Sequence, residues 1–276
     1  VQSKYYEGWY DFFSQRAEGD VTRDDANQTT TARLVVPDEV TFERAVSIGD
    51  GGYTHDSGGG GLDESEYSEG ETHASVEPLI DAAVADAEDS NQSIEDCVDT
   101  ADACGAGTYY DSDDVNLDGE VDFDTSEGNI TIAIDGDLDI GNSDLTVINE
   151  GSGTVKYYIN GSVLANGNAK VRTAPSAVEA QRNQFYVSED FLEETSGTIE
   201  IDAIVYAPNS DTEIGGSITL RGGFVFNSLT TGDNAFTIEH DESLAELSIP
   251  ITGGAGQNPI TYLHVSENVV EIDFDR

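Results

Sequence analysis

The feature that most constrains the fold is a repeated pattern over residues 129–244, where short β-branched or aromatic runs are broken by Gly, Asn or Asp. The runs can be superimposed so that four dipeptides fall at equivalent places: Asp135-Gly136, Asn160-Gly161, Tyr206-Ala207 and Phe226-Asn227. Repeated strand, turn and strand units of uneven spacing are typical of a parallel β-helix or a related solenoid. An antiparallel sandwich with hairpins at the same sites is the alternative, and the matching turn positions favour the solenoid.

The charge of the chain is the second constraint. There are 56 Asp and Glu residues against 11 Lys and Arg residues, which gives a formal net charge of -45. The acid is spread along a chain with 37% hydrophobic residues, so it does not form a disordered acidic tail. Such a protein repels itself in dilute buffer, whereas at about 1 M salt the Debye length falls to about 3 Å and screens the repulsion. The composition therefore predicts a protein of a halophilic archaeon, and it argues against nucleic acid as a partner.

Two cysteines, Cys97 and Cys104, are separated by a short loop. A metal site usually needs more ligands in closer pairs. We therefore predict a disulfide, which indicates an oxidising, extracellular location. Two reduced cysteines in a loop are the alternative.

The remaining pattern divides the chain into successive parts. We predict an N-terminal helix plus strands over residues 1–48, with an aromatic stripe on the helix at residues 3–16, and a flexible Gly-rich acidic loop over residues 49–74. A helix over residues 75–98, which residues 91–93 can interrupt, and the disulfide loop fill residues 75–128. The β-solenoid follows over residues 129–244, with an excursion at 173–196, and a C-terminal hairpin over residues 245–276 is expected to pack on the N-terminal part. The expected fold is mainly β, a solenoid with a smaller α+β N-terminal part containing two helices.

The acidic segment at residues 111–125 allows two interpretations. Asp114, Asn116 and Asp118, followed by Gly119, match the first half of a calcium loop of the EF-hand or dockerin kind. The bidentate acid expected at the twelfth position is replaced by Thr125, however. The run from 117 to 120 also suits a hairpin turn, which we favour over the calcium site.

Few side chains suggest catalysis, and we predict no catalytic residue and no cofactor. His55 and His73 are expected to be solvated in the acidic loop, and His264 to be structural. The exception is His240-Asp241, with Arg221 upstream. Right-handed β-helices host lyases and hydrolases of polysaccharides, so a carbohydrate-active enzyme acting on surface polysaccharide is the alternative to a non-enzymatic protein.

Four N-x-[ST] sequons are present, and they permit glycosylation of a surface protein. Their acceptors are Asn27, Asn91, Asn129 and Asn160.

A family resemblance adds to this interpretation. In residues 201–244 a YAPN turn, a Gly-rich coil and an H-D-x-x-L ending follow one another, carried by Tyr206, Ala207, Pro208, Asn209, His240, Asp241 and Leu244. This segment resembles a module of bacterial and archaeal surface proteins that often lies beside a type IV pilin-like, or PilX-like, N-terminus. The segments VQSKYYEGWYDFF and PITYLHVSENVVEI resemble the N-terminal and C-terminal ends of the proteins in a haloarchaeal family of envelope proteins.

The resemblance implies a pilin-like or envelope-associated ectodomain, located at the cell surface or in a pilus, that serves adhesion or filament assembly. Its partners would be other surface or pilus subunits, or surface glycans. The chain contains no methionine, so we expect that a segment before Val1, with a hydrophobic anchor, has been removed, and that the membrane is reached only through that anchor.

Overall fold

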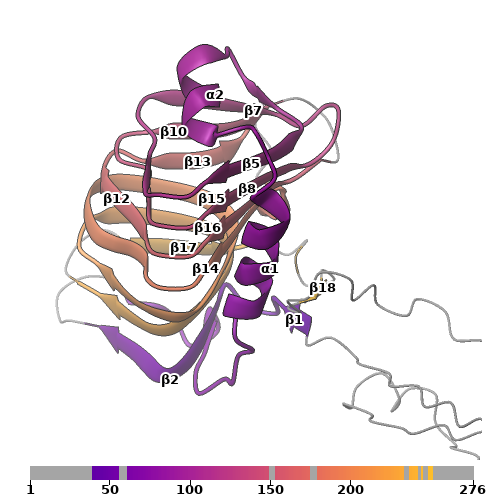
Figure 1. Ribbon diagram of the computed structural model, residues 1–276. Helices are drawn as coiled ribbons and strands as arrows, with labels where there is room; N and C mark the ends of the chain where they lie inside the picture. Colours follow the sequence, from indigo (N-terminus) through magenta and orange to yellow (C-terminus); the bar gives the residue numbers. More distant parts are fainter. Residues whose placement is uncertain are drawn as a thin grey trace, which may run out of the picture. The chain divides into compact units, whose positions relative to one another are not determined.

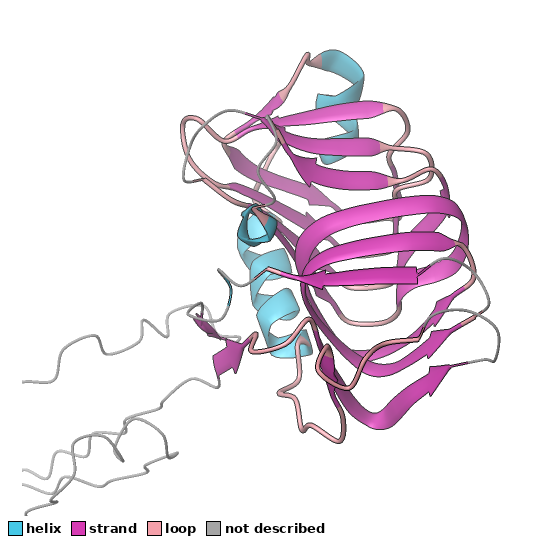
Figure 2. Cartoon of the chain, turned by 180° about the vertical axis from the view of Figure 1, so that it is seen from behind, coloured by secondary structure: helices cyan, strands magenta, loops and turns pink. Residues whose placement is uncertain are grey.

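The computed structural model describes residues 39–55, 61–148, 153–174, 179–232, 236–241, 244 and 248–250, all of which lie within the compact unit Asp38–Ala255. These residues form short strands that wind into coils stacked one upon another, with a helix along one side (Figures 1 and 2). Adjacent coils pair in parallel throughout. The predicted β-solenoid is therefore confirmed, and the antiparallel sandwich is wrong.

Each coil places strands on faces that we name A, B and C. Face A consists of β4 (Cys104–Gly105), β7 (Glu120–Asp124), β10 (Asp144–Ile148), β13 (Lys170–Thr173), parts of β15 (Phe191–Ile214) and β16 (Ser217–Thr231), and β17 (Phe236–His240). Face B consists of β5 (Gly107–Asp111), β8 (Ile130–Ile134), β11 (Val155–Ile159), β14 (Asn183–Val187) and further parts of β15 and β16. Face C consists of β6 (Val115–Asn116), β9 (Leu138–Asp139), β12 (Val163–Gly167) and the remaining parts of β15 and β16.

The last coil is completed by the N-terminal part of the chain. β17 supplies its face A, while β2 (Val46–His55) supplies faces B and C by pairing in parallel with β16 from Phe224↔Val46 to Thr231↔His55. The short strand β3 (Tyr67–Ser68) adds to β2. Next to this end, β1 (Glu39–Thr41) and β18 (Ser248–Pro250) form a separate antiparallel pair.

Two helices connect this end of the stack to the other. Helix α1 (Glu77–Ala87) buries Ile80, Val84 and Ala87 against the outer side of face B, in a cluster with Tyr186 and Tyr206. Helix α2 (Ile94–Thr100) packs Ile94, Cys97 and Val98 against the interior of the first coil. A 3-10 turn, η1 (Ala180–Arg182), precedes β14.

The interior of the coils is a stack of alternating strand residues. Apolar side chains such as Ile130, Ile132 and Ile134 face inward and are at most 1% exposed. Aromatic rings continue from coil to coil, and Tyr157 and Phe185 are stacked with their centroids 4.1 Å apart. Each coil buries its apolar side only when the next coil covers it, which is why the repeat is stable as a set.

Several predicted boundaries are wrong. The region 49–74 is not a loop throughout, because Gly49 to His55 belong to β2 and Tyr67–Ser68 forms β3. A Cβ on Gly51 would lie 2.6 Å from Cβ of Ser228, so glycine serves close packing of β2 on β16 here and does not indicate flexibility. The interruption allowed at residues 91–93 of the predicted helix is present, by contrast, because α1 ends at Ala87 and Ser93 caps α2 by accepting a hydrogen bond from the amide of Asp96.

The solenoid is also longer than predicted. It begins at β4 and not at residue 129, so most of the predicted disulfide-loop region consists of coils. The favoured hairpin at 117–120 is wrong, because β6 pairs with β9 and β7 pairs with β10 on different faces. The predicted excursion at 173–196 holds β14 and the start of β15, which form a regular coil. The predicted helix at residues 3–16 and the C-terminal hairpin lie outside the described residues, except for β18.

Candidate functional site

The predicted disulfide is present. Cys97 in α2 and Cys104 in β4 are joined, with their Cα atoms 5.9 Å apart. The bond fixes the helix that covers the first coil to the strand that begins it. The cysteine pair therefore has a structural position at one end of the stack.

Three of the four sequon asparagines are described, and all three are exposed. Asn91 lies between the two helices. Oδ1 of Asn129 accepts a hydrogen bond from the amide of Thr154 at 3.0 Å, and Nδ2 of Asn160 donates to Asp135 at 2.7 Å. Glycosylation at these positions stays a prediction, and Asn27 lies outside the described residues.

The calcium interpretation of residues 114–118 meets a geometric obstacle. Val115 and Leu117 are buried, so Asp114 and Asn116 alternate outward along an extended chain. Alternate residues of such a chain lie about 6.6 Å apart, too far for their oxygens to converge readily on one ion. Asp114 instead accepts a hydrogen bond from the amide of Asp137, and Asn116 donates to Asp139, both in the next coil.

Asp118 is exposed and precedes Gly119, whose φ is +92° at the turn into β7. Within the part of the chain that the structure describes, no group of three His, Cys, Asp or Glu residues is arranged to hold a metal ion. Calcium binding by Asp114, Asn116 and Asp118 stays a prediction that this geometry does not favour.

The predicted cluster around His240 separates into two sets of contacts. Nε2 of His240 lies 2.9 Å from the carbonyl oxygen of Phe42, in the segment between β1 and β2. Arg221 instead donates from Nη1 to Asp202 at 3.0 Å and from Nε to Glu239 at 3.1 Å. Asp241 follows His240, and its amide bonds the carbonyl oxygen of Gly222.

Arg221 belongs to a row of side chains that we call the charge ladder. The row runs up the outer side of face A at one register position of successive coils: Asp122, Thr146, Arg172, Asp202, Arg221 and Glu239. Asp202 is 9% exposed, and its burial raises its pKa, an effect that the hydrogen bond and charge of Arg221 partly offset. A further ion pair joins Arg172 to Asp144 at 2.6 Å.

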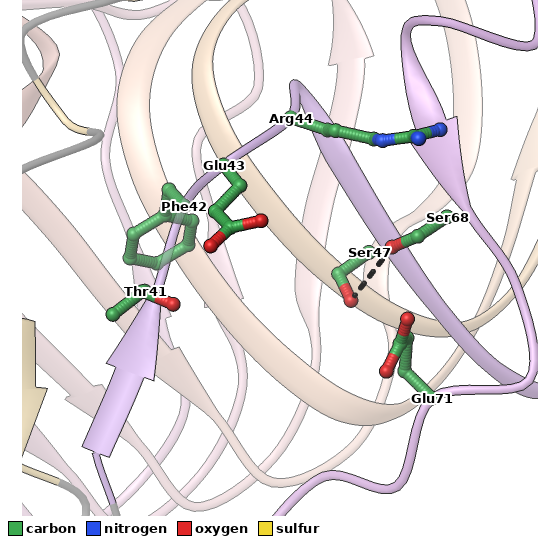
Figure 3. A pocket seen from close by; sticks show the side chains of 7 residues that line it. All are labelled: Thr41, Phe42, Glu43, Arg44, Ser47, Ser68 and Glu71. Carbon is green, nitrogen blue, oxygen red and sulfur yellow. Dashed lines mark hydrogen bonds between the residues drawn. The ribbon is translucent and has the colours of Figure 1, made fainter.

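Two adjoining polar grooves lie beside the last coil, with volumes of about 430 and 450 Å³. Figure 3 shows one of them, between the segment that follows β1 and the strands β2 and β3. Thr41, Ser47 and Glu71 line both grooves. At the rim, Arg44 donates to the carbonyl oxygens of Glu64, at 2.8 Å, and of Tyr67.

A chain of polar side chains forms the floor of these grooves. The hydroxyl of Ser68 donates to Ser47 at 3.4 Å, and Oγ of Ser47 lies 3.4 Å from Nε2 of His73. Burial lowers the pKa of His73, while the charge of Glu71 opposes that shift. A neutral imidazole beside hydroxyl and carboxylate groups can exchange hydrogen bonds with the hydroxyl groups of a ligand.

The prediction that His55 and His73 are solvated is wrong. Both are partly buried, and Nδ1 of His55 lies 2.9 Å from the hydroxyl of Thr231. Sequence reasoning missed the grooves because Ser47 and His73 are brought together only when β2 joins the last coil. The acidic, Gly-rich composition of the intervening segment concealed that pairing.

No helix in the described part of the chain has the length and apolar character needed to cross a membrane.

No curated protein matches the chain, and no solved structure matches it. The model of one family, described as a domain of unknown function (DUF7305), matches residues 59–247. That match covers more than half of the 276 residues, from the loop before β3 to the end of the coils. The chain therefore belongs to the DUF7305 family.

Proposed function

We propose that this chain is a non-enzymatic ectodomain at the surface of a halophilic archaeon, serving adhesion or filament assembly. The observation that carries the proposal is that charged side chains hold successive coils together. The amides of Asp137, Ser162 and Asp211 each donate to an aspartate of the preceding coil, at 2.8–3.0 Å. These hydrogen bonds between coils make the solenoid rigid, and a rigid solenoid can present its outer faces to a partner.

The covalent closure of the first coil supports an extracellular location. Disulfides persist in oxidising compartments, and the bond between Cys97 and Cys104 fixes the cap of the solenoid. Such a closure keeps the end of the stack covered.

The net charge of -45 supports a high-salt environment. The midpoint of thermal unfolding is expected to rise steeply as potassium chloride is raised from about 0.1 M to about 2 M, because the Debye length shortens over that range. Circular dichroism measures this directly. An unchanged midpoint would remove the support for a halophilic source.

The polar grooves support a role in adhesion. Hydroxyl groups of Ser47, Ser68 and Thr41, with the carboxylate of Glu71, suit the hydroxyl-rich surface of a neutral glycan. The two acids that line the first groove, Glu43 and Glu71, outnumber its one base, so anionic sugars are disfavoured.

The test is to locate the native protein. An antibody raised against this ectodomain, applied to unbroken cells in their growth brine, should label the cell surface or its filaments. Labelling only after lysis would overturn the proposal. Antibody against a cytoplasmic protein serves as the control for cell integrity.

A carbohydrate-active enzyme is the second candidate, favoured by the raised pKa of Asp202 beside Glu239 on an outer sheet face. A carboxyl whose pKa is raised is better able to supply a proton as a general acid in glycoside cleavage. Release of reducing sugar from envelope polysaccharide, lost in Asp202→Asn and retained in Asp241→Ala, would establish this activity. No release by the unmodified chain in molar salt would exclude it for that substrate.

A further inference from the structure

The charge ladder carries an inference about how two copies of the chain meet, which rests on the proposed role in assembly. Six basic residues are described, and three of them point outward from face A: Lys170, Arg172 and Arg221. The others have different settings, since Arg182 is buried, Lys156 is half-buried on face B and Arg44 binds carbonyl groups at the groove. Face A therefore carries three of the six described basic residues, more than any other face of the coils.

Local charge balance matters because the chain is strongly negative. Two copies with a charge of -45 repel each other wherever carboxylates face carboxylates. In the charge ladder from β13 to β17, acids alternate with bases along the stacking direction, so an approaching copy meets both signs. Close approach over this row therefore costs less than approach over carboxylates alone.

The order of charges also makes the ladder self-complementary. From β13 to β17 it reads Arg172, Asp202, Arg221 and Glu239, which is plus, minus, plus, minus. A two-fold axis parallel to the strands, passing between β15 and β16, reverses this order in the second copy. Arg172 then faces Glu239 of the second copy, and Asp202 faces Arg221 of the second copy, so every charge of the four meets its opposite.

Exposure fits this arrangement at the outer pair. The side chain of Arg172 is 47% exposed and that of Glu239 is 58% exposed, so each can add a contact across an interface beside its ion pair within the chain, Arg172 with Asp144 and Glu239 with Arg221. Asp202 and Arg221 are less exposed, and their ion pair forms the fixed centre of the pattern. Such an isologous contact, in which the same patch is used twice, is the common form of homodimer.

We propose that face A is the surface through which two copies of this chain associate in antiparallel order, with Arg172 of each bound to Glu239 of the other. Salt screens an ion pair in direct contact less than it screens attraction between distant charges. The pairing sets the register of the two stacks, while the strand surfaces around it supply the contact area.

Sedimentation velocity of the ectodomain in about 2 M potassium chloride tests the proposal, over loading concentrations up to about 100 µM. The unmodified chain should show a concentration-dependent dimer. Arg172→Glu alone and Glu239→Arg alone should each weaken dimerisation at least about tenfold, because like charges then face each other across the axis.

Mixing the two variants provides the decisive arm. An Arg172→Glu copy beside a Glu239→Arg copy restores opposite charges at both outer pairs, so the mixture should dimerise although neither variant does alone. Changes within each chain are the same mixed or unmixed, which separates the interface from misfolding. Thr54→Glu, at an exposed position on β2, controls for added negative charge.

A monomer at every concentration overturns the proposal, and so does a dimer that neither substitution weakens or a pair of variants that fails to recombine. Surface labelling of native cells tests the proposed function separately. A monomeric protein found at the cell surface would therefore reject this interface and leave the surface role standing.

Discussion

Tyr157 and Phe185 are stacked face to face in the interior of the solenoid, with ring centroids 4.1 Å apart and planes 4° from parallel. They come from β11 and β14, which pair in register at this position. The tyrosine is fully buried, and among the described residues its hydroxyl has no hydrogen-bond partner. The hydroxyl of Tyr157 therefore loses its hydrogen bonds to water on folding, and no hydrogen bond within the described residues replaces them.

Tyr157→Phe is therefore expected to stabilise the protein. The substitution keeps the stacked ring and removes an unsatisfied hydroxyl, whose burial costs about 1–3 kcal/mol. Chemical unfolding in constant high salt should show a higher midpoint for the variant.

The matched control is Tyr186→Phe on the adjacent strand. Tyr186 is also buried, but its hydroxyl donates to Oε1 of Gln184 at 3.0 Å. Its removal should lower stability by about 0.5–1.5 kcal/mol. If both variants lose stability equally, the hydroxyl of Tyr157 is satisfied in solution.

Gly222→Ala is expected to destabilise the stack strongly. Gly222 has a φ of +140°, and a Cβ there would lie 2.0 Å from the carbonyl oxygen of Ala203 in the coil beneath. Backbone strain and overpacking together should cost at least about 2 kcal/mol. Thermal unfolding of the variant gives the measurement.

Gly105→Ala is the control for this substitution. A Cβ at Gly105 would meet nothing within 4 Å, so the expected change is within about 0.5 kcal/mol. Equal losses for the two variants would contradict close contact between coils as the cause, because alanine acting through the unfolded chain would raise stability.

Local alternation was enough to predict the solenoid and part of its register. The alignment of Asp135-Gly136 with Asn160-Gly161 is confirmed, because these dipeptides directly follow β8 and β11, which pair in register. The alignment of Tyr206 with Phe226 is displaced by one residue, because Phe226 pairs with Ala207. Inward positions repeat reliably since each must be apolar, whereas corners vary in length and shift the apparent register.

The completion of the last coil could not be predicted from local patterns. Val46 pairs with Phe224 although they lie far apart in the sequence, and periodicity contains no information about such partners. The grooves depend on the same pairing, which is why the contact between Ser47 and His73 was missed. The charge ladder was missed for a related reason, since its members occur once per coil among many other acids.

The disulfide is expected to contribute measurably to stability. It closes a loop with a sequence separation of 7 residues, for which restriction of the unfolded chain predicts about 2–3 kcal/mol. The free energy of unfolding of the double variant, Cys97→Ala with Cys104→Ala, should therefore be lower than that of the oxidised protein by that amount. Hydrogen exchange should locate the loss in α2 and β4, and uniform loss over all coils would contradict the capping role.

The pH dependence of stability should carry a contribution from His73. Burial lowers its pKa below the usual 6.5, so the folded state binds a proton less readily than the unfolded state does. This contribution is fully present above about pH 6.5 and is lost as the pH falls through the folded pKa. His73→Gln should remove it, so the difference in unfolding free energy between the two proteins should change as the pH falls below about 6.5 and stay constant above it.

Because Glu71 opposes the shift, Glu71→Gln should lower the pKa of His73 further in an NMR titration. A pKa at or above 6.5 in the unmodified protein would contradict both the burial of the imidazole and its place beside Ser47 at the floor of the grooves.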